Sequence, residues 1–355
     1  MLLGDLGARI LKVEHPEDGD VTRAWGPPYH EATGLSAYYL SVNRNKESIA
    51  LDLATPNGAE SVRRLARRAD VLVENFPPGG LEKFGLSLSE LRRENPRLIT
   101  ASITGFGRTG PDASAPGFDL LAQAGAGLMA ITGTAEAEPT KAGVAVSDLF
   151  AGCYAAIGIL AALASRERTG RASHVETDLF SATLGSLINV AQSALLTGKE
   201  AERHGNAHPQ IVPYRTFHAS DGDFVLGVGT DRQFERLAQL LGHPEWSRDP
   251  RYAANDARVA HRSELEALLA PIFRTEARAT WVSRCRAAGI PAGPVRGPLE
   301  ALRSANARAL GSVRECEGVA FVAPPIRIDD EPAPLRFPPA LDADGERIRK
   351  EFGLP

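Results

Sequence analysis

Short apolar runs alternate with helical patterns along the first hundred residues. The apolar runs that are typical of strands cover residues 10–14, 48–53, 70–74 and 98–103. A helical pattern begins at Thr55-Pro56, which supply a cap and a first helical position, and a second, short one begins at Leu86 and ends before Pro96. Because apolar residues predominate in these strand runs, which alternate with helical patterns, the sequence predicts a parallel sheet with helices on both faces, as in an α/β domain.

The stretch 141–170 carries the strongest candidate for chemistry. A β-like run at 143–146 leads into Ser147-Asp148, and a long apolar helical pattern follows. The carboxylate of Asp148 is therefore expected on a first helical turn, where free N–H groups favour an anion. Such a carboxylate can be a nucleophile, or it can simply mark a helix start. The apolar segment 149–164 ends at a charged run, so we interpret it as a buried core helix rather than a membrane span.

The pattern of predicted strands and helices changes near residue 198. A strand pattern at 222–229 precedes helical patterns at 232–242, 261–273 and 280–289, and the tail from Gly318 is rich in Pro and Arg. We therefore expect a large α/β domain over 1–197, a small α+β domain over 198–305, and a return segment over 306–355. The return segment is expected to run extended and to pack on the large domain or on a partner subunit. The chain opens on what resembles the end of a helix, so the first strand of the large domain is expected to be missing.

Composition narrows the class of protein. The 355 residues are 43% hydrophobic and 24% charged, with a net charge of −4, which argues against nucleic acid as a partner. The three cysteines are far apart, so neither a disulfide framework nor a cysteine zinc site is expected, and a cytoplasmic location fits. His204 and His208 are four residues apart, but the surrounding GNAHP resists helix, so we expect no metal site there. We also expect no tightly bound cofactor.

Glycines and a second aspartate lie beyond the strand at 98–103. GFGRTG at 105–110 is followed by Pro111, which opposes the helix start that a dinucleotide motif needs. We interpret this loop as one that lets a ligand approach the backbone. Asp119 directly precedes an apolar helical pattern, and either a helix cap or a second carboxylate beside Asp148 would fit that position.

Polar and basic residues follow two of the strand patterns. Asn75 and Phe76 come directly after the strand at 70–74, at the edge where ligands bind in open α/β sheets, although an ordinary turn would also fit. Arg44, Lys46 and Lys83 could meet phosphates, with a solvated basic face as the alternative.

These motifs, in this order, resemble the family III CoA-transferases over nearly the whole chain. The segments that carry the resemblance are LGDLGARILKVEHP, GDVTR, NRNKESIALDL, ADVLVENFPPGGLEKFGL, NPRLITASITGFG, PGFDLLAQA, the Asp148 segment and AAGIPAGPV. Within the family, TRAWGPP, YYLSVNRNK, SITGFGRTGP, GVAVSDL and IVPYRTF are similar to the dicarboxylate branch, the succinate–hydroxymethylglutarate CoA-transferases.

The resemblance implies a Rossmann-like large domain, a smaller domain and an interlocked homodimer. It implies a nucleophilic role for Asp148, which would form an anhydride with the acyl group and then a thioester with CoA, and a supporting role for Asp119. Coenzyme A and acyl-CoA would be substrates, with succinyl-CoA as the donor and a dicarboxylate as the acceptor. Arg215 and Arg232 are candidate cations for that acid. By the same resemblance, the CoA-binding residues would be His15, Leu51, Asp52, Leu53, Ala54, Asn75, Phe76 and Lys83.

Two departures from relatives of this family bear on the reaction. GNAHPQ at 205–210 stands where formyl-CoA transferases have a glycine-run loop, which argues against formyl transfer. Phe118 stands where the 2-methylacyl-CoA racemases have a histidine, so proton exchange between two bases would lose one base. A racemase and a truncated, non-catalytic CoA-binding paralogue remain the alternatives.

Overall fold

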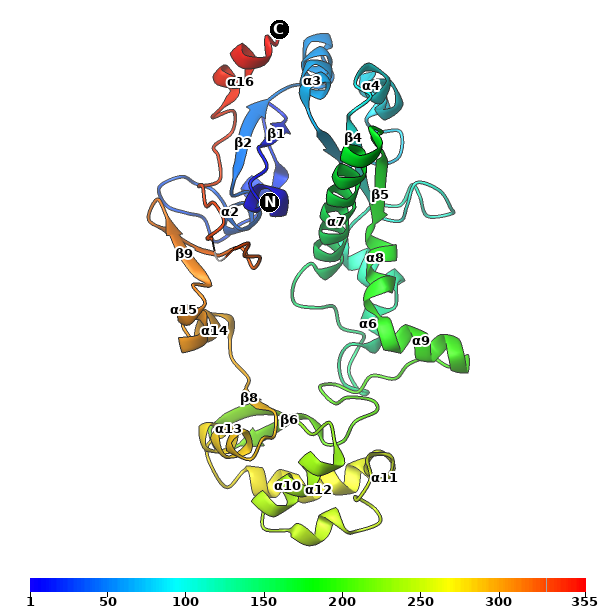
Figure 1. The fold of residues 1–355 in the computed structure, drawn as a ribbon, viewed down its shortest axis with the longest axis vertical. Coiled ribbons are helices and arrows are strands. Elements are labelled where there is room, and N and C mark those ends of the chain that lie inside the picture. The colour runs from blue at the N-terminus through cyan, green and yellow to red at the C-terminus, as the bar shows by residue number, and fades with distance from the viewer. Residues whose placement is uncertain (330) are drawn as a thin grey trace. The chain divides into compact units, whose positions relative to one another are not determined.

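The computed structural model describes residues 1–329 and 331–355, and its chain divides into two compact units (Figure 1). The larger unit comprises Met1–Leu128, Ala142–Leu195 and Leu302–Pro355. The smaller unit comprises Met129–Lys141 and Leu196–Ala301. The short segment before Ala142 thus belongs with the smaller unit, although it lies between two parts of the larger unit in the sequence.

The larger unit is built on parallel strands. β1 (Ile10–Glu14) pairs with β2 (Lys46–Ala50), and β3 (Val71–Glu74), β4 (Ile99–Thr104) and β5 (His174–Asp178) form a second sheet in that order. The predicted mixed α/β class with parallel sheets is confirmed, and the strands are divided between two sheets. The helices of this unit that precede α7 are α1 (Leu2–Asp5), η1 (Val21–Ala24), α2 (Ala37–Val42), α3 (Pro56–Arg68), η2 (Glu82–Phe84), α4 (Leu88–Glu94) and α5 (Asp119–Gly125), with α6 (Leu128–Ile131) at the unit boundary.

The connection from β2 to α3 shows why the second strand ends earlier than the sequence pattern predicts. The Thr55 hydroxyl accepts from Gly58 N at 3.1 Å and caps α3, while Thr55 N donates to Asp52 O at 3.1 Å. A Cβ on Gly58 would lie 1.8 Å from Asp52 O, so this turn requires glycine. Residues 51–54 therefore form a turn instead of extending the strand.

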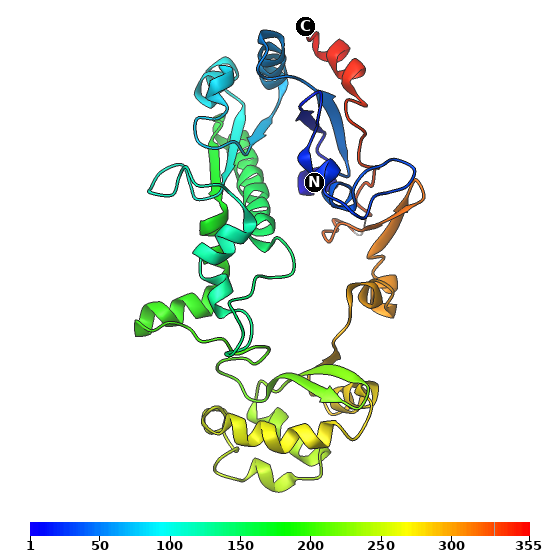
Figure 2. The ribbon, with the colours of Figure 1, turned by 180° about the vertical axis from the view of Figure 1, so that it is seen from behind.

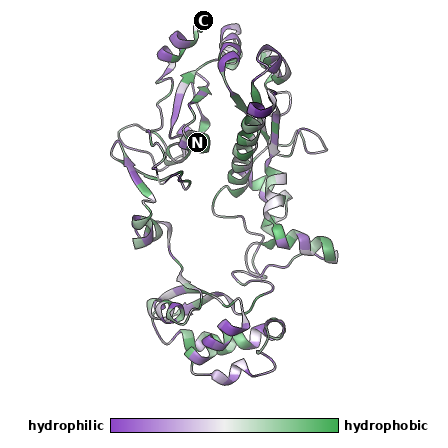
Figure 3. Ribbon diagram, viewed as in Figure 1, coloured by the Kyte–Doolittle hydropathy of each residue, from purple (hydrophilic) through white to green (hydrophobic). Residues whose placement is uncertain are grey.

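Helix α7 (Val146–Thr169) is the longest helix of the larger unit and packs against β4, β5, α5 and α8 (Leu179–Ser186), which α9 (Ile188–Thr197) follows. The expected strand at 143–146 is wrong, because α7 already begins at Val146. Apolar residues dominate α7 (Figure 3), but only 28% of its most apolar stretch is buried. By length and composition alone this helix could span a membrane, as core helices of soluble proteins also could, and the burial that we expected for it is only partial within this chain.

The C-terminal segment belongs to the larger unit and contains α15 (Ala305–Ala309), the hairpin of β9 (Val313–Cys316) with β10 (Val319–Val322), and α16 (Gly345–Phe352). The tail contacts β2 through hydrogen bonds from backbone N–H groups of the strand to side-chain carboxylates of the tail. Ser48 N donates to Asp344 Oδ2 at 3.0 Å, and Ala50 N donates to Asp342 Oδ1 at 2.7 Å. The tail is thus part of the larger unit's packing, and it ends in a helix that the sequence analysis did not anticipate.

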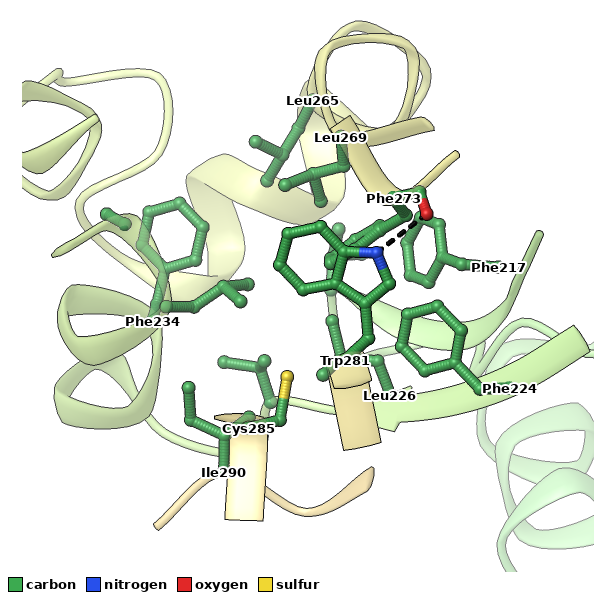
Figure 4. Close-up of a cluster of buried hydrophobic side chains, with 14 of the residues drawn as sticks. Phe217, Phe224, Leu226, Phe234, Leu265, Leu269, Phe273, Trp281, Cys285 and Ile290 are labelled. Atoms are coloured by element: carbon green, nitrogen blue, oxygen red, sulfur yellow. Dashed lines mark hydrogen bonds between the residues drawn. The ribbon is translucent and has the colours of Figure 1, made fainter. Parts of the chain in front are cut away.

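The smaller unit has a three-stranded antiparallel sheet of β6 (Tyr214–Ala219), β7 (Gly222–Gly227) and β8 (Ala292–Pro294). Figure 2 shows its helices beside this sheet, and Figure 4 shows the aromatic core between them. In that core, Trp281 Nε1 donates to Phe273 O at 2.7 Å. The helices are α10 (Asp231–Leu240), η3 (Pro244–Ser247), α11 (Asn255–Ala260), α12 (Arg262–Phe273) and α13 (Arg278–Ala287), with α14 (Pro298–Leu302) at the boundary.

Candidate active site

Asp148 lies in the first turn of α7, as the sequence predicts. Its side chain is exposed, and among the described residues no hydrogen bond reaches its carboxylate. Partial desolvation, with a further contribution from the charge of Asp119, raises the pKa of Asp148 from 3.8 to about 6. A carboxylate with this pKa is still mostly ionised at neutral pH, and its oxygen atoms are free to react.

Asp119, the first residue of α5, caps the start of α7. Its Oδ1 accepts a hydrogen bond from Ser147 N at 2.9 Å, which satisfies one of the free N–H groups of that helix. The cap position of α7 is occupied by Ala145, whose methyl group cannot accept. Asp148 therefore does not cap α7, because the carboxylate of Asp119, which lies on another helix, does so. Ser147 Oγ accepts instead from Thr183 Oγ1 at 2.7 Å.

Gln123 holds Asp119 in this position, and the sequence analysis did not identify it. Its Nε2 donates to Asp119 Oδ2 at 2.7 Å, and its Oε1 accepts from Ala142 N at 2.8 Å. The residue is fully buried. The four-residue spacing between Asp119 and Gln123 on one helix was the available signal, since such pairs face each other.

Two glycines bring the segment that carries Asp119 to the end of β4. A Cβ on Gly105 would lie 2.4 Å from the Cα of Gly117, so the two backbones touch. Phe180 N also donates to Gly105 O at 3.1 Å, which links this point to α8. The close approach that we expected in the 105–110 loop therefore occurs at Gly105, but the group that approaches is another part of the same chain.

The predicted CoA-binding residues near the first two strands lie at one edge of that sheet. His15 follows β1 and is exposed, and Leu51, Asp52, Leu53 and Ala54 follow β2. Leu51 N donates to Glu14 O at 2.9 Å, which holds the two strand ends together. Because the strands are parallel, these residues come together at their carboxyl ends, where ligands bind in open sheets.

The remaining predicted CoA-binding residues gather after β3. Asn75 is exposed, and Phe76 N donates to Glu74 Oε2 at 2.8 Å. The ring of Phe76 lies 6.1 Å from that of Phe84, edge to face, and Phe84 is the neighbour of the exposed Lys83 in η2. Asn75, Phe76 and Lys83 therefore form one local group, with a cation available to an anionic ligand.

The other two basic candidates differ from our expectation. Arg44 is 4% exposed and pairs with Asp5 through two hydrogen bonds of 2.9 and 2.7 Å, so it stabilises the fold and is not available to phosphate. Lys46 Nζ donates to Asn43 Oδ1 at 2.8 Å, and burial lowers its pKa to about 8. Tyr38 was not predicted as a site residue; its pKa is raised by burial and then by the charges of Asp148 and Asp119.

In the smaller unit, the two candidate cations differ in their contacts. Arg215 forms an ion pair with Glu266, while Arg232 is exposed in the first turn of α10. Over residues 1–329 and 331–355, the structure shows no group of three or more His, Cys, Asp and Glu side chains that could hold a metal ion. The three cysteines are free thiols.

The fold and this site define an α/β protein with an exposed carboxylate in the first turn of a long helix that a second aspartate caps. Residues 1–345 match the model of CoA-transferase family III, and the chain belongs to that family of enzymes, which confirms the resemblance. It is 43% identical over 314 residues to the succinate–glutarate CoA-transferase of Agrobacterium fabrum, covering 87% of this chain and 78% of that protein. It is 38% identical over 357 residues to the acetyl-CoA:oxalate CoA-transferase of Acetobacter aceti, covering 100% and 91%. The crystal structure of a CaiB/BaiF family protein from Brucella suis matches with a TM-score of 0.88 and 43% identity, covering 99% of this chain and 93% of that one.

Proposed function

We propose that this enzyme transfers CoA from succinyl-CoA to a dicarboxylate, with Asp148 as the nucleophile. The observation that carries the proposal is the state of that carboxylate. It projects from a helix start whose capping is already done by Asp119, so its own oxygens are free. With a pKa of about 6, roughly nine-tenths of it is ionised at pH 7. The names of two relatives, which act with glutarate and oxalate, support a dicarboxylate acceptor.

The proposed reaction has four acyl-transfer steps, and in each step one bond to a carbonyl carbon forms as another breaks. The Asp148 carboxylate attacks the thioester carbonyl of succinyl-CoA, the C–S bond breaks, and a mixed anhydride and CoA thiolate result. The thiolate then attacks the aspartyl carbonyl of the anhydride, releasing succinate and leaving an aspartyl-CoA thioester. The acceptor carboxylate attacks this thioester and forms a second anhydride and the thiolate. Attack of the thiolate on the acceptor's carbonyl gives the new acyl-CoA and restores Asp148.

The edges of the two parallel sheets supply the proposed CoA contacts. His15 and the turn 51–54 lie after β1 and β2, while Asn75, Phe76 and Lys83 lie after β3. Lys83 is exposed, and its ammonium group can pair with a phosphate of CoA. Phe118, in place of the histidine of the racemases, leaves Asp148 and Asp119 as the acidic groups here, which favours acyl transfer over proton exchange.

Trapping the acyl-enzyme tests this proposal. The protein is incubated with succinyl-CoA, quenched with hydroxylamine, and mapped by mass spectrometry for a hydroxamate on Asp148. Asp148→Asn is expected to form none. The matched control is Asp178→Asn, because Asp178 caps α8 through its own side chain and asparagine can do the same. A wild-type protein without an adduct, or an adduct on another residue, would refute the nucleophile. Glutarate, oxalate and acetate as acceptors then test the dicarboxylate preference.

We also propose that a second copy of the chain covers the apolar face of the larger unit, as in the interlocked homodimer of the resemblance. On α7, Leu149, Ile157 and Leu160 are 56%, 62% and 44% exposed, and on α9, Ile188 and Leu195 are 71% and 80% exposed. Exposed large apolar side chains on two helices of one unit are typical of an interface. Light scattering after gel filtration should show a dimer for the wild type and a smaller species for Ile157→Glu; a monomeric wild type would refute the proposal.

A further inference from the structure

Gln123 occupies a position that only a primary amide satisfies. It is fully buried, with Asp119 Oδ2 at 2.7 Å from its Nε2 and Ala142 N at 2.8 Å from its Oε1. An ionised carboxylate can only accept and a backbone N–H can only donate, so the amide has one possible orientation. A glutamate here would place two acceptors together, and a leucine would leave Asp119 Oδ2 and Ala142 N each without this partner.

These contacts fix the chain on both sides of the turn that leads to the nucleophile. Ala142 begins the segment that enters α7, and Ser147, directly before Asp148, is bound by Asp119 at 2.9 Å. Gln123 contacts the first point directly and the second through Asp119. The segment between them contains Gly143, where an added Cβ would meet nothing within 4 Å, so local packing at that glycine does little to fix the path.

We propose that Gln123 is a positioning residue for the transfer reaction: through Asp119 and Ala142, it fixes the first turn of α7 and thereby the direction of the Asp148 carboxylate. This inference rests on the proposed role of Asp148 as nucleophile. Attack on a thioester requires an oxygen of the carboxylate close to the carbonyl carbon and aligned with it, and a displacement of about 1 Å can cost a factor of about 100 in rate. Gln123 itself touches neither substrate nor the reacting atoms in this scheme.

The first test is the rate at which wild type, Gln123→Glu and Gln123→Leu acylate Asp148 in a single turnover with succinyl-CoA. Both variants are expected to lose about 10-fold to 100-fold in the maximal rate, while the succinyl-CoA concentration for half-maximal rate changes less than about twofold. The matched control is Gln233→Glu. Gln233 also accepts backbone N–H groups at a helix start, from Gly229 and Thr230, but glutamate serves equally well in that capping box.

A double variant separates this role from a general loss of packing. When Asp119→Asn is combined with Gln123→Glu, the new amide at position 119 can accept from Ser147 N and donate to the new carboxylate at position 123. The other oxygen of that carboxylate can accept from Ala142 N. All three hydrogen bonds are thereby restored, with donor and acceptor exchanged between positions 119 and 123. The double variant is expected to acylate at least about fivefold faster than Gln123→Glu alone, which packing loss at two sites would not produce.

The possible results separate a failure of the positioning role from a failure of the proposed function. Acylation of Gln123→Glu at the wild-type rate would overturn the positioning role, and so would a double variant that is folded yet no faster than Gln123→Glu. A loss that appears only as weaker succinyl-CoA binding would also overturn it. Absence of an adduct on Asp148 in the wild type would instead refute the proposed function, so the two failures can be told apart.

Discussion

The proposed nucleophilic role of Asp148 predicts that its raised pKa sets the acid side of the enzyme's pH profile. A nucleophilic carboxylate reacts only when ionised, and its pKa of about 6 replaces the ordinary 3.8. At pH 7 roughly nine-tenths of Asp148 is ionised, and at pH 5 roughly one-tenth. The single-turnover rate of acylation should therefore fall about tenfold between these values. With an unshifted pKa, about nine-tenths would remain ionised at pH 5, and the rate would hardly change.

The assay is a rapid-quench measurement of the Asp148 adduct between pH 4.5 and 8 at succinyl-CoA concentrations well below saturation, where the rate reports the pKa of the free enzyme. Asp119→Asn provides the second arm, because the charge of Asp119 is the smaller of the two causes of the shift. Its acid limb should move to lower pH, even if its rate at pH 7 is reduced. An acid limb with its midpoint near pH 4 in the wild type would refute this reasoning, as would a rate that rises on acidification.

The raised pKa also bears on stability. An unfolded Asp148 ionises near pH 3.8 and the folded one near 6, so the folded state loses stability as the pH rises between these values. Asp148→Asn should then stabilise the fold at pH 7 by about 1 kcal/mol, a value that allows for solvent screening of an exposed group. Near pH 3.5 the substitution should leave the stability unchanged. Equal effects at the two pH values would contradict the raised pKa. Gly105→Ala should destabilise by about 2 kcal/mol in urea unfolding, because its Cβ would meet Gly117 at 2.4 Å, and an unchanged midpoint would count against that contact. Trp281→Phe leaves the buried carbonyl of Phe273 without this donor and should lower stability by about 1–3 kcal/mol; a neutral effect in urea unfolding would argue otherwise.

Local signals predicted the larger unit well. The strand at 10–14 has the predicted bounds, and the Thr55 cap with Pro56 marks the start of α3, because both features depend on neighbours in sequence. The prediction of a strand at 143–146 was wrong: alternating valines suggest a strand, but no strand forms there. Strand β6 was not predicted, since its short run of mixed residues gains its partner only through the hairpin with β7.

Contacts between residues that are far apart in the sequence limited how much of the site could be predicted. The position of Asp148 on a first turn could be predicted, but the source of the cap could not, because the Asp119 carboxylate accepts from Ser147 N across 28 residues of the chain. Nothing local indicated that Arg44 would be buried, since its partner Asp5 lies 39 residues away. The apolar composition of α7 predicted that the helix would be buried, but composition alone does not identify the surface that covers the helix.

The contacts between the tail and β2 bear on the order in which the chain can fold. Asn45 Oδ1 accepts from Arg336 N at 2.7 Å, and the N–H groups of Ser48 and Ala50 donate to Asp344 and Asp342. A ribosome makes the first fifty residues early, yet these groups meet their partners only when synthesis is almost finished. The smaller unit, whose main segment is continuous, can complete its core sooner. A premature stop in the last twenty residues should therefore expose the beginning of the protein to proteases.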